Sequence, residues 1–300
     1  MKKHFFLMAL MAIAPLALIS CGDDDDESAE STPKVNLSTP AYKDNAAKFT
    51  IDNVPTKLNG KDILLTGLEF TESGYYLITY REAAAATRTD NFDLSYYMSK
   101  YIMSGESDYT LSDFGHVKIA GKSGNNYLLL VKSAGEEEFE VPATPWNGNV
   151  KPGTETDYLC RTWTITNTRL MGTVMNNGKT IKLGRDFPGE CDLNQIIDYA
   201  KEQGANITDY IDDNSIVKGV TFTEKGTYLL NFNRSTYDVG EWRWTDMTKG
   251  LLSYTWNNPT EMGNPLESGI AQVAFANNEC KLTLKSTVSE FDLEMICTMH

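Results

Sequence analysis

The sequence predicts an all-β protein made of two tandem antiparallel barrels, and three observations support this fold class. The segment GLEFTESGYYL at residues 67–77 returns as GVTFTEKGTYL at residues 219–229, with seven of eleven positions identical at a spacing of 152 residues. The same spacing relates EFEV at residues 138–141 to EFDL at residues 290–293. Short segments of alternating polarity, separated by turn signals, accompany both copies. A barrel is favoured because closure leaves no strand edge unpaired.

The first barrel is predicted to occupy residues 43–141. Leu94, Met98 and Ile102 lie at helical spacing together with Tyr101, which predicts a short helix inserted within residues 83–103. Its strands, which include a hairpin around residues 71–74, are expected at residues 48–51, 63–70, 75–80, 116–120, 127–131 and 138–141.

A linker is predicted at residues 142–157, because this stretch holds three prolines and little that can be buried. The second barrel is predicted to follow at residues 158–300. Asn177-Gly178 predicts a type I′ hairpin turn, since both turn positions need positive φ. Strands are expected at residues 159–174, 216–223, 227–233, 241–245, 251–256, 270–276, 280–284 and 291–298.

A helix is predicted at residues 192–202 of the second domain. Asp192 can cap its first turn, Gln195 can reach back to the cap, and Gly204 can end it. Its apolar stripe consists of Leu193, Ile196, Ile197 and Ala200. Each barrel is therefore expected to carry one short helix.

The first twenty residues are predicted to be a signal peptide. Lys2 and Lys3 precede an apolar run at residues 5–17, which is too short to span a bilayer comfortably. The run ends in Leu-Ile-Ser before Cys21, which resembles the lipobox of bacterial lipoproteins. The resemblance implies cleavage before Cys21 and acylation of this residue, with a membrane affinity of about 0.8 kcal/mol per buried methylene. The alternative is a plain signal peptide with an incidental cysteine.

An acidic linker follows the anchor at residues 21–42. Its run DDDDE at residues 23–27 must be solvated, since like charges beside a membrane cannot pack. The run resembles the signal that follows the lipidated cysteine in surface lipoproteins of Bacteroidota-type bacteria. The resemblance implies a protein held in the outer membrane and facing the cell exterior. The alternative is a hydrophilic stalk on a lipoprotein that faces the periplasm.

The second domain also resembles the lipocalin-like domains of Bacteroidota lipoproteins. The resemblance rests on LCRTWTIT at residues 159–166, FTEKGTYLL at 222–230, GEWRW at 240–244 and KLTLKS at 281–286. In the first domain, Phe49 stands where the second has Trp163, and about 38 residues between this strand and the repeated hairpin are missing. The sequence therefore leaves open whether the first barrel is complete.

Composition and motifs indicate a protein without catalysis, cofactor or metal. The net charge of −14 would repel nucleic acid, so no nucleic-acid partner is expected. Outside the signal peptide the only histidines are His116 and His300, neither of which has ligands at metal-binding spacing. No glycine-rich phosphate loop opens a helix. Carboxylates are plentiful, however, so a carboxylate-dependent hydrolase stays an alternative.

Four cysteines remain after Cys21, and they allow three disulfide connectivities. Cys280 and Cys297 would lie opposite each other on the inner face if Leu284 pairs with Leu293, with a four-residue loop at residues 287–290. This register predicts a disulfide between Cys280 and Cys297. The alternative is free buried thiols.

Aromatic residues on two neighbouring strands are the candidate ligand-lining residues: Tyr228, Phe232, Trp242 and Trp244. They can be core packing, the wall of an apolar pocket in the barrel, or an outward platform for stacking sugars. The sequence therefore predicts non-covalent binding of a small apolar ligand or a glycan by a membrane-anchored protein. The alternative is a structural accessory subunit with filled barrels that contacts another envelope protein.

Overall fold

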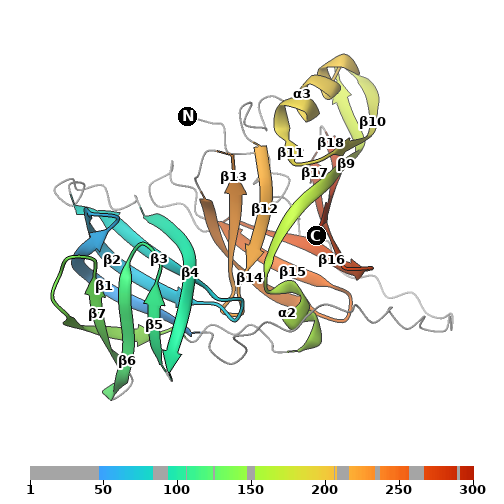
Figure 1. Ribbon diagram of the computed structural model, residues 1–300. Helices are drawn as coiled ribbons and strands as arrows, with labels where there is room; N and C mark the ends of the chain where they lie inside the picture. The colour runs from blue at the N-terminus through green and yellow to red at the C-terminus, as the bar shows by residue number, and fades with distance from the viewer. Residues whose placement is uncertain are drawn as a thin grey trace. The chain divides into compact units, whose positions relative to one another are not determined.

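The structure is a computed structural model of the chain. It describes residues 47–83, 94–105, 107–123, 126–146, 153–205, 207, 216–233, 237–256, 267–288 and 291–300. These residues divide into two compact units, each built around one closed antiparallel barrel (Figure 1). The two-barrel fold class is therefore confirmed. The signal peptide, Cys21 and the acidic run lie outside the described residues.

The first barrel is a complete eight-stranded meander. Its strands are β1 (Ala47–Leu58), β2 (Lys61–Phe70), β3 (Tyr75–Glu82), β4 (Ser95–Gly105), β5 (Asp108–Leu111), β6 (Gly115–Ser123), β7 (Asn126–Ser133) and β8 (Phe139–Pro145). Each strand pairs antiparallel with the next, and β8 returns to β1, where Pro145 lies opposite Phe49. This closure shows that the first barrel is complete.

The second barrel closes with the same number of strands and carries additional elements. Its elements are α2 (Thr154–Leu159), β9 (Thr162–Asn176), β10 (Lys179–Pro188), β11 (Cys191–Asp192), α3 (Leu193–Glu202), β12 (Ile216–Phe222), β13 (Thr227–Phe232), β14 (Tyr237–Asp246), β15 (Leu251–Trp256), β16 (Glu267–Ala276), β17 (Glu279–Val288) and β18 (Phe291–Met299). Strand β9 pairs with both β12 and β18, which closes the barrel. The segment with β10, β11 and α3 is inserted between β9 and β12.

The sequence repeat corresponds to a repeated strand pairing. Phe49 lies opposite Leu68 in the first barrel, and Trp163 lies opposite Val220 in the second. A register shift between Leu65 and Gly67 also recurs 152 residues later, between Val217 and Gly219. The two copies therefore share their opening strand, their first hairpin and the irregularity within it.

The glycine that begins the repeated segment has a structural reason in both barrels. A Cβ atom at Gly67 would lie 3.3 Å from the Phe49 carbonyl oxygen, and one at Gly219 would lie 2.1 Å from the Trp163 carbonyl oxygen. The opening strand passes so close at this register shift that only glycine fits without displacing backbone in the second barrel.

Strand β4 replaces the helix predicted within residues 83–103, and that prediction is wrong for residues 95–103. The burial follows a period of two: Tyr97, Tyr101 and Met103 pack into the core, whereas Ile102 is 65% exposed. Aromatic side chains favour strands, and β4 hydrogen-bonds to β3 and β5 on its two sides. These pairings outweigh the helical spacing of four apolar residues.

Two predicted boundaries also differ from the structure. Strand β8 extends through four residues of the predicted linker, to Pro145, because Val141 and Ala143 continue its buried face while Pro142 is exposed. The strand predicted from residue 159 begins at Thr162, because α2 occupies the preceding residues.

Helix α3 confirms the prediction for residues 192–202. The Asp192 carboxylate accepts a hydrogen bond of 3.0 Å from the backbone N–H of Asn194, and Gln195 Nε2 donates to it over 3.1 Å. Gly204 has a φ of 84°, as a helix-ending glycine requires. The predicted turn at Asn177-Gly178 is also confirmed, with φ values of 50° and 75°.

Candidate functional site

Aromatic side chains fill one part of the second barrel. Three of the four predicted ligand-lining residues, Tyr228, Trp242 and Trp244, are buried, and the fourth, Phe232, is half-buried near the end of β13. Trp242 stands edge-on to Trp244, with ring centroids 5.6 Å apart, and edge-on to Phe222 at 5.7 Å. The rings therefore pack against one another, which is the core arrangement among the three alternatives.

Sequence reasoning missed two members of this cluster, Phe222 and Tyr254. Phe222 lies opposite Tyr228 across the β12–β13 ladder, and Tyr254 lies opposite Trp242 across the β14–β15 ladder. The Tyr254 ring stands edge-on to the Tyr228 ring, with centroids 6.3 Å apart. The alternation of Leu252 and Tyr254 along β15 was a signal that could have placed Tyr254 on the inner face.

A glycine fixes the position of the Tyr228 ring. A Cβ atom at Gly240 would lie 2.5 Å from a carbon of this ring, so the ring packs directly on the Gly240 backbone. The Tyr228 hydroxyl donates to the Thr255 carbonyl oxygen over 3.2 Å. Both contacts hold the side chain against the barrel wall, where it cannot turn toward a ligand without breaking them.

Helix α2 is bound to the barrel by two buried indoles. Trp244 Nε1 donates to Thr156 Oγ1 over 2.8 Å, and Trp163 Nε1 donates to the Leu159 carbonyl oxygen over 2.9 Å. Both acceptors belong to α2, and both are buried. Because buried indole N–H groups need a partner, α2 and the two tryptophans stabilise each other and cover this part of the interior.

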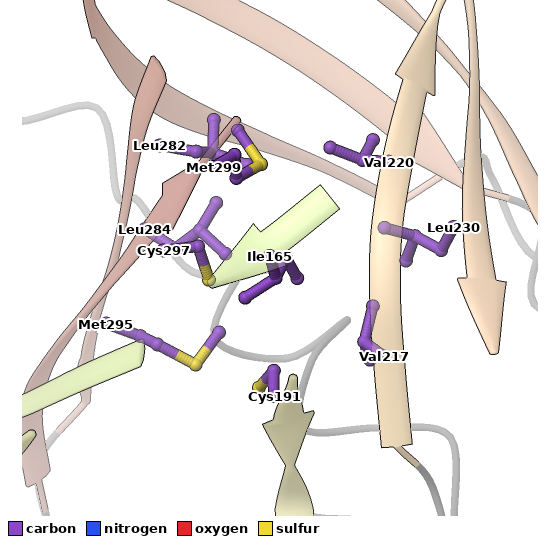
Figure 2. Close-up of a pocket in the computed structure, with 10 residues that line it drawn as sticks. All are labelled: Ile165, Cys191, Val217, Val220, Leu230, Leu282, Leu284, Met295, Cys297 and Met299. Carbon is purple, nitrogen blue, oxygen red and sulfur yellow. The ribbon is translucent and has the colours of Figure 1, made fainter. Parts of the chain in front are cut away.

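A small apolar cavity lies elsewhere in the second barrel. Its volume is about 20 Å³, which is room for about one water molecule. Figure 2 shows the ten residues that line it: Ile165, Cys191, Val217, Val220, Leu230, Leu282, Leu284, Met295, Cys297 and Met299. None of the four predicted ligand-lining residues belongs to this cavity.

All four cysteines in the described part of the chain are buried free thiols. The predicted disulfide between Cys280 and Cys297 is wrong, because the β17–β18 register differs by two residues from the predicted one. Cys280 lies opposite Met299, and Cys297 lies opposite Leu282. Strand β17 runs to Val288, so two residues rather than four separate it from β18.

Cys297 instead meets Cys191 of β11. The two thiols share a hydrogen bond, which lowers the pKa of Cys191 and raises that of Cys297. One thiolate can thus be stabilised by the S–H of the other. For Cys280, burial is the main influence, and it raises the pKa of the thiol.

The first barrel is also filled by aromatic side chains. The Phe70 and Tyr109 rings stack with centroids 4.0 Å apart, and Tyr101 stands edge-on to both at 5.4 Å. The Tyr101 hydroxyl donates to the Thr71 carbonyl oxygen over 2.6 Å. Burial raises the pKa values of Tyr76 and Tyr109, and the Tyr76 hydroxyl donates to the carbonyl oxygen of Ser112.

His116 lies on β6, and its Nε2 contacts the Asp108 carboxylate. Ser104 Oγ donates to the same carboxylate oxygen over 3.1 Å. The serine and the histidine thus both bind the acid, whereas nucleophilic catalysis needs a bond between serine and histidine. His300 pairs with Glu279 at 3.2 Å. Within the described ranges, no three His, Cys, Asp or Glu side chains gather in a group able to hold a metal ion.

Comparison of the sequence with models of known protein families finds no match, and comparison with curated proteins finds none either. In the part of the chain that the structure describes, no helix combines the length and the hydrophobicity needed to span a membrane.

Proposed function

We propose that the protein is a lipid-anchored envelope protein of the outer membrane whose two barrels form a structural accessory module. The observation that carries the proposal is the packing of both interiors by side chains. The aromatic cluster occupies the second barrel, and the stacked rings of Phe70, Tyr101 and Tyr109 occupy the first. A filled barrel offers its outer surface and loops to a partner, which we infer to be another envelope protein.

Carriage of a small apolar ligand is the competing function. Sites for drug-sized ligands have volumes of about 300–1,000 Å³. The cavity that the described residues of the second barrel line has a volume of about 20 Å³, so such a ligand could enter it only by displacing packed side chains. Stacking of a glycan is equally disfavoured, because Trp242 and Trp244 are 3% and 5% exposed.

A thermal-shift screen distinguishes these functions. We expect fatty acids, bile acids, haem and glycans to leave the melting temperature of the full-length protein unchanged, because a ligand raises it only by binding the native state. A saturable rise with one of these compounds would replace the accessory function by ligand carriage.

Photo-crosslinking in intact cells tests the accessory function itself. A crosslinking amino acid at Ile102 on β4, at Met175 on β9 or at Ile270 on β16 places the probe on an exposed apolar side chain of the outer surface. We expect at least one position to give a discrete crosslinked species containing a second envelope protein. Exposed Lys281 on β17 is the control for random collision. Equal labelling at every position would contradict the proposal.

The membrane anchor is tested separately. Growth with an alkyne-tagged palmitate should label the protein, and Cys21→Ser should abolish the label and release the protein from membranes. Replacing residues 23–27 with alanine should then make the anchored protein resistant to protease added to intact cells. Unchanged accessibility to the protease would contradict the surface location and would leave the proposed lipid anchor unaffected.

A further inference from the structure

Strand β10 leaves one edge of the sheet in the second barrel open. The strand has ten residues, Lys179–Pro188, and it pairs with β9 alone, without a shift in register. Figure 1 shows β10 beside β9, with α3 nearby. An edge of this length presents a row of backbone N–H and C=O groups with which another polypeptide segment can pair.

One hydrogen bond shows which backbone groups face outward. The backbone N–H of Gly184 donates to the Tyr199 hydroxyl of α3 over 2.9 Å, so it points away from β9. Residues two apart in an antiparallel strand point their backbone groups to the same side, so Thr180, Lys182 and Asp186 also direct theirs to the open edge. Tyr199 is the only described residue that hydrogen-bonds to the backbone on this side.

The open edge is basic, although the chain as a whole is acidic. Lys179, Lys182 and Arg185 are three of its ten residues, whereas lysine and arginine supply 27 of the 300 residues of a chain with a net charge of −14. All three side chains are exposed, and none forms an ion pair with another residue that the structure describes. The one acidic residue of the strand, Asp186, lies 3.8 Å from the Arg169 guanidinium. The basic side chains of β10 are thus left for another partner.

Aromatic rings hold the Arg185 side chain in place. Its guanidinium carbon lies 5.4 Å from the centroid of the Phe187 ring and 5.3 Å from that of the Tyr199 ring. The two rings pack edge-on against each other, with centroids 5.8 Å apart. A guanidinium group that packs over a ring keeps its N–H donors available for a carboxylate. Arg185 therefore offers a preorganised contact for a carboxylate beside the strand edge.

We propose that the open edge of β10 binds an extended acidic segment of the envelope protein that the accessory module contacts. The inference rests on the proposed function and names the surface that serves it. The segment adds as a further strand, with its carboxylates near Lys182 on one face of the sheet and near Lys179 and Arg185 on the other. Because the basic side chains lie on both faces, a run of consecutive acidic residues fits better than an alternating one.

A second copy of the chain fits this edge less well. Antiparallel pairing of two β10 strands about Gly184 would set Lys182 of each opposite Asp186 of the other, but it would bring two edges of net positive charge together. Each Asp186 also already lies close to Arg169. The test therefore includes the oligomeric state.

Fluorescence anisotropy of a labelled peptide tests the proposal with the full-length protein in detergent. The probe is a synthetic peptide of glutamate, threonine and valine, and we expect it to bind saturably. The same peptide with lysine in place of every glutamate should not bind, because it repels the basic edge. N-methylation of alternate residues of the acidic peptide removes the donors that pair with β10 and should weaken binding by at least about 10-fold.

Variants of β10 test the same contacts from the protein side. Thr180→Pro removes an outward N–H without disturbing the pairing with β9 and should weaken binding by at least about 10-fold. Lys182→Glu with Arg185→Glu should have a similar effect through charge. Lys118→Glu with Lys281→Glu makes the same change of charge at exposed positions on other strands and should leave the affinity unchanged.

Two further measurements keep the test decisive if the proline variant does not fold. Tyr199→Phe keeps the ring beside Arg185 but frees the Gly184 N–H for the added strand, so it should tighten binding by about 5-fold. In the unmodified protein, the amide proton of Lys182 should exchange with deuterium more slowly when the acidic peptide is bound.

Four results would each overturn the proposal: no binding of the acidic peptide, full binding of its N-methylated form, unchanged exchange at Lys182, or a dimer that Thr180→Pro dissociates. The accessory function fails separately. If the peptide binds β10 but photo-crosslinking in cells finds no envelope partner, the edge is a peptide site without that function. Crosslinked species that persist in Thr180→Pro would retain the accessory function and exclude this edge as its surface.

Discussion

The two barrels differ most at the connection between their first two strands. In the first barrel, β1 and β2 are joined by a two-residue turn, Asn59-Gly60, in which both residues have positive φ. In the second barrel, β9 and β12 are separated by β10, β11 and α3. The pairing of the two opening strands is nevertheless retained. Barrel closure therefore depends on strand pairing, and the turn is a place where a long insertion is tolerated.

The insertion also changes the barrel wall. Leu65 of the first barrel lies opposite Val54, whereas Val217, its counterpart 152 residues later, lies opposite Cys191. The two residues of β11 thus occupy the place that continuous β1 has in the first barrel. The insertion thereby brings the buried thiol of Cys191 into the wall.

The largest expected difference between the barrels concerns the paired glycines. Gly219→Ala places a Cβ atom 2.1 Å from a backbone oxygen, so we expect a loss of about 3 kcal/mol or more. Gly67→Ala meets its nearest neighbours at 3.3 Å and should cost about 1 kcal/mol. Urea unfolding followed by tryptophan fluorescence and calorimetry measures both. Equal losses would show that the two hairpins are packed alike.

The opening strand carries Phe49 in the first barrel and Trp163 in the second, so each residue can be replaced by the other. Trp163→Phe installs the residue of the first barrel and leaves the buried Leu159 carbonyl oxygen without its indole donor, which should cost about 2 kcal/mol. Phe49→Trp must fit a larger ring beside the Tyr127 ring, whose centroid lies 5.5 Å from that of the Phe49 ring. This substitution should lower the free energy of unfolding by about 1–3 kcal/mol. Thermal unfolding of both variants checks this. A neutral Phe49→Trp would mean that the first barrel has room for an indole.

Alkaline pH should distinguish the barrels through their buried tyrosines. Burial raises the pKa of Tyr76 and Tyr109 in the first barrel and of Tyr254 in the second above the usual 10.0. The unfolded chain therefore ionises first, so stability is complete below pH 10 and falls as the pH rises further. Calorimetry between pH 8 and 11 should show a steeper loss for the first barrel, which Tyr76→Phe reduces. A slope unaffected by this substitution would contradict the assignment.

The smallest effect is expected for Cys191→Val, which installs the counterpart Val54. The side chains are similar in volume and the cavity is adjacent, so the free energy of unfolding should change by less than about 1.5 kcal/mol. Chemical denaturation provides the measurement, with Cys160→Val as the control at a buried thiol away from the cavity. A loss of several kcal/mol would show that the thiol pair is structural.

The sequence was sufficient for the features that are local or repeated. The turn at Asn177-Gly178, the capping of α3 by Asp192 and the repeated hairpin all depend on residues close together in the chain. The helix predicted around Tyr101 was wrong because pairing with β3 and β5 decides the conformation of β4. Such pairing is not visible in a local spacing of apolar residues.

The candidate site was predictable only in part. Alternation placed Tyr228, Trp242 and Trp244 on the inner face, but only the structure shows that Phe222 and Tyr254 complete a packed cluster. The register of β17 and β18 could not be read because a shift of two residues keeps every side chain on the same face. The proximity of Cys191 and Cys297 depends on β11, whose two residues are too few to show an alternating pattern.

The insertion has a mechanical consequence for the second barrel. Strand β9 is held to β18 by nine residue pairs but to β12 by only three, between residues 162–164 and 219–221. The β9–β12 pairing is thus the shorter of the two pairings by which β9 closes the barrel. It should therefore separate first under heat or pulling force. Amide protons along this pairing should therefore exchange with deuterium earliest.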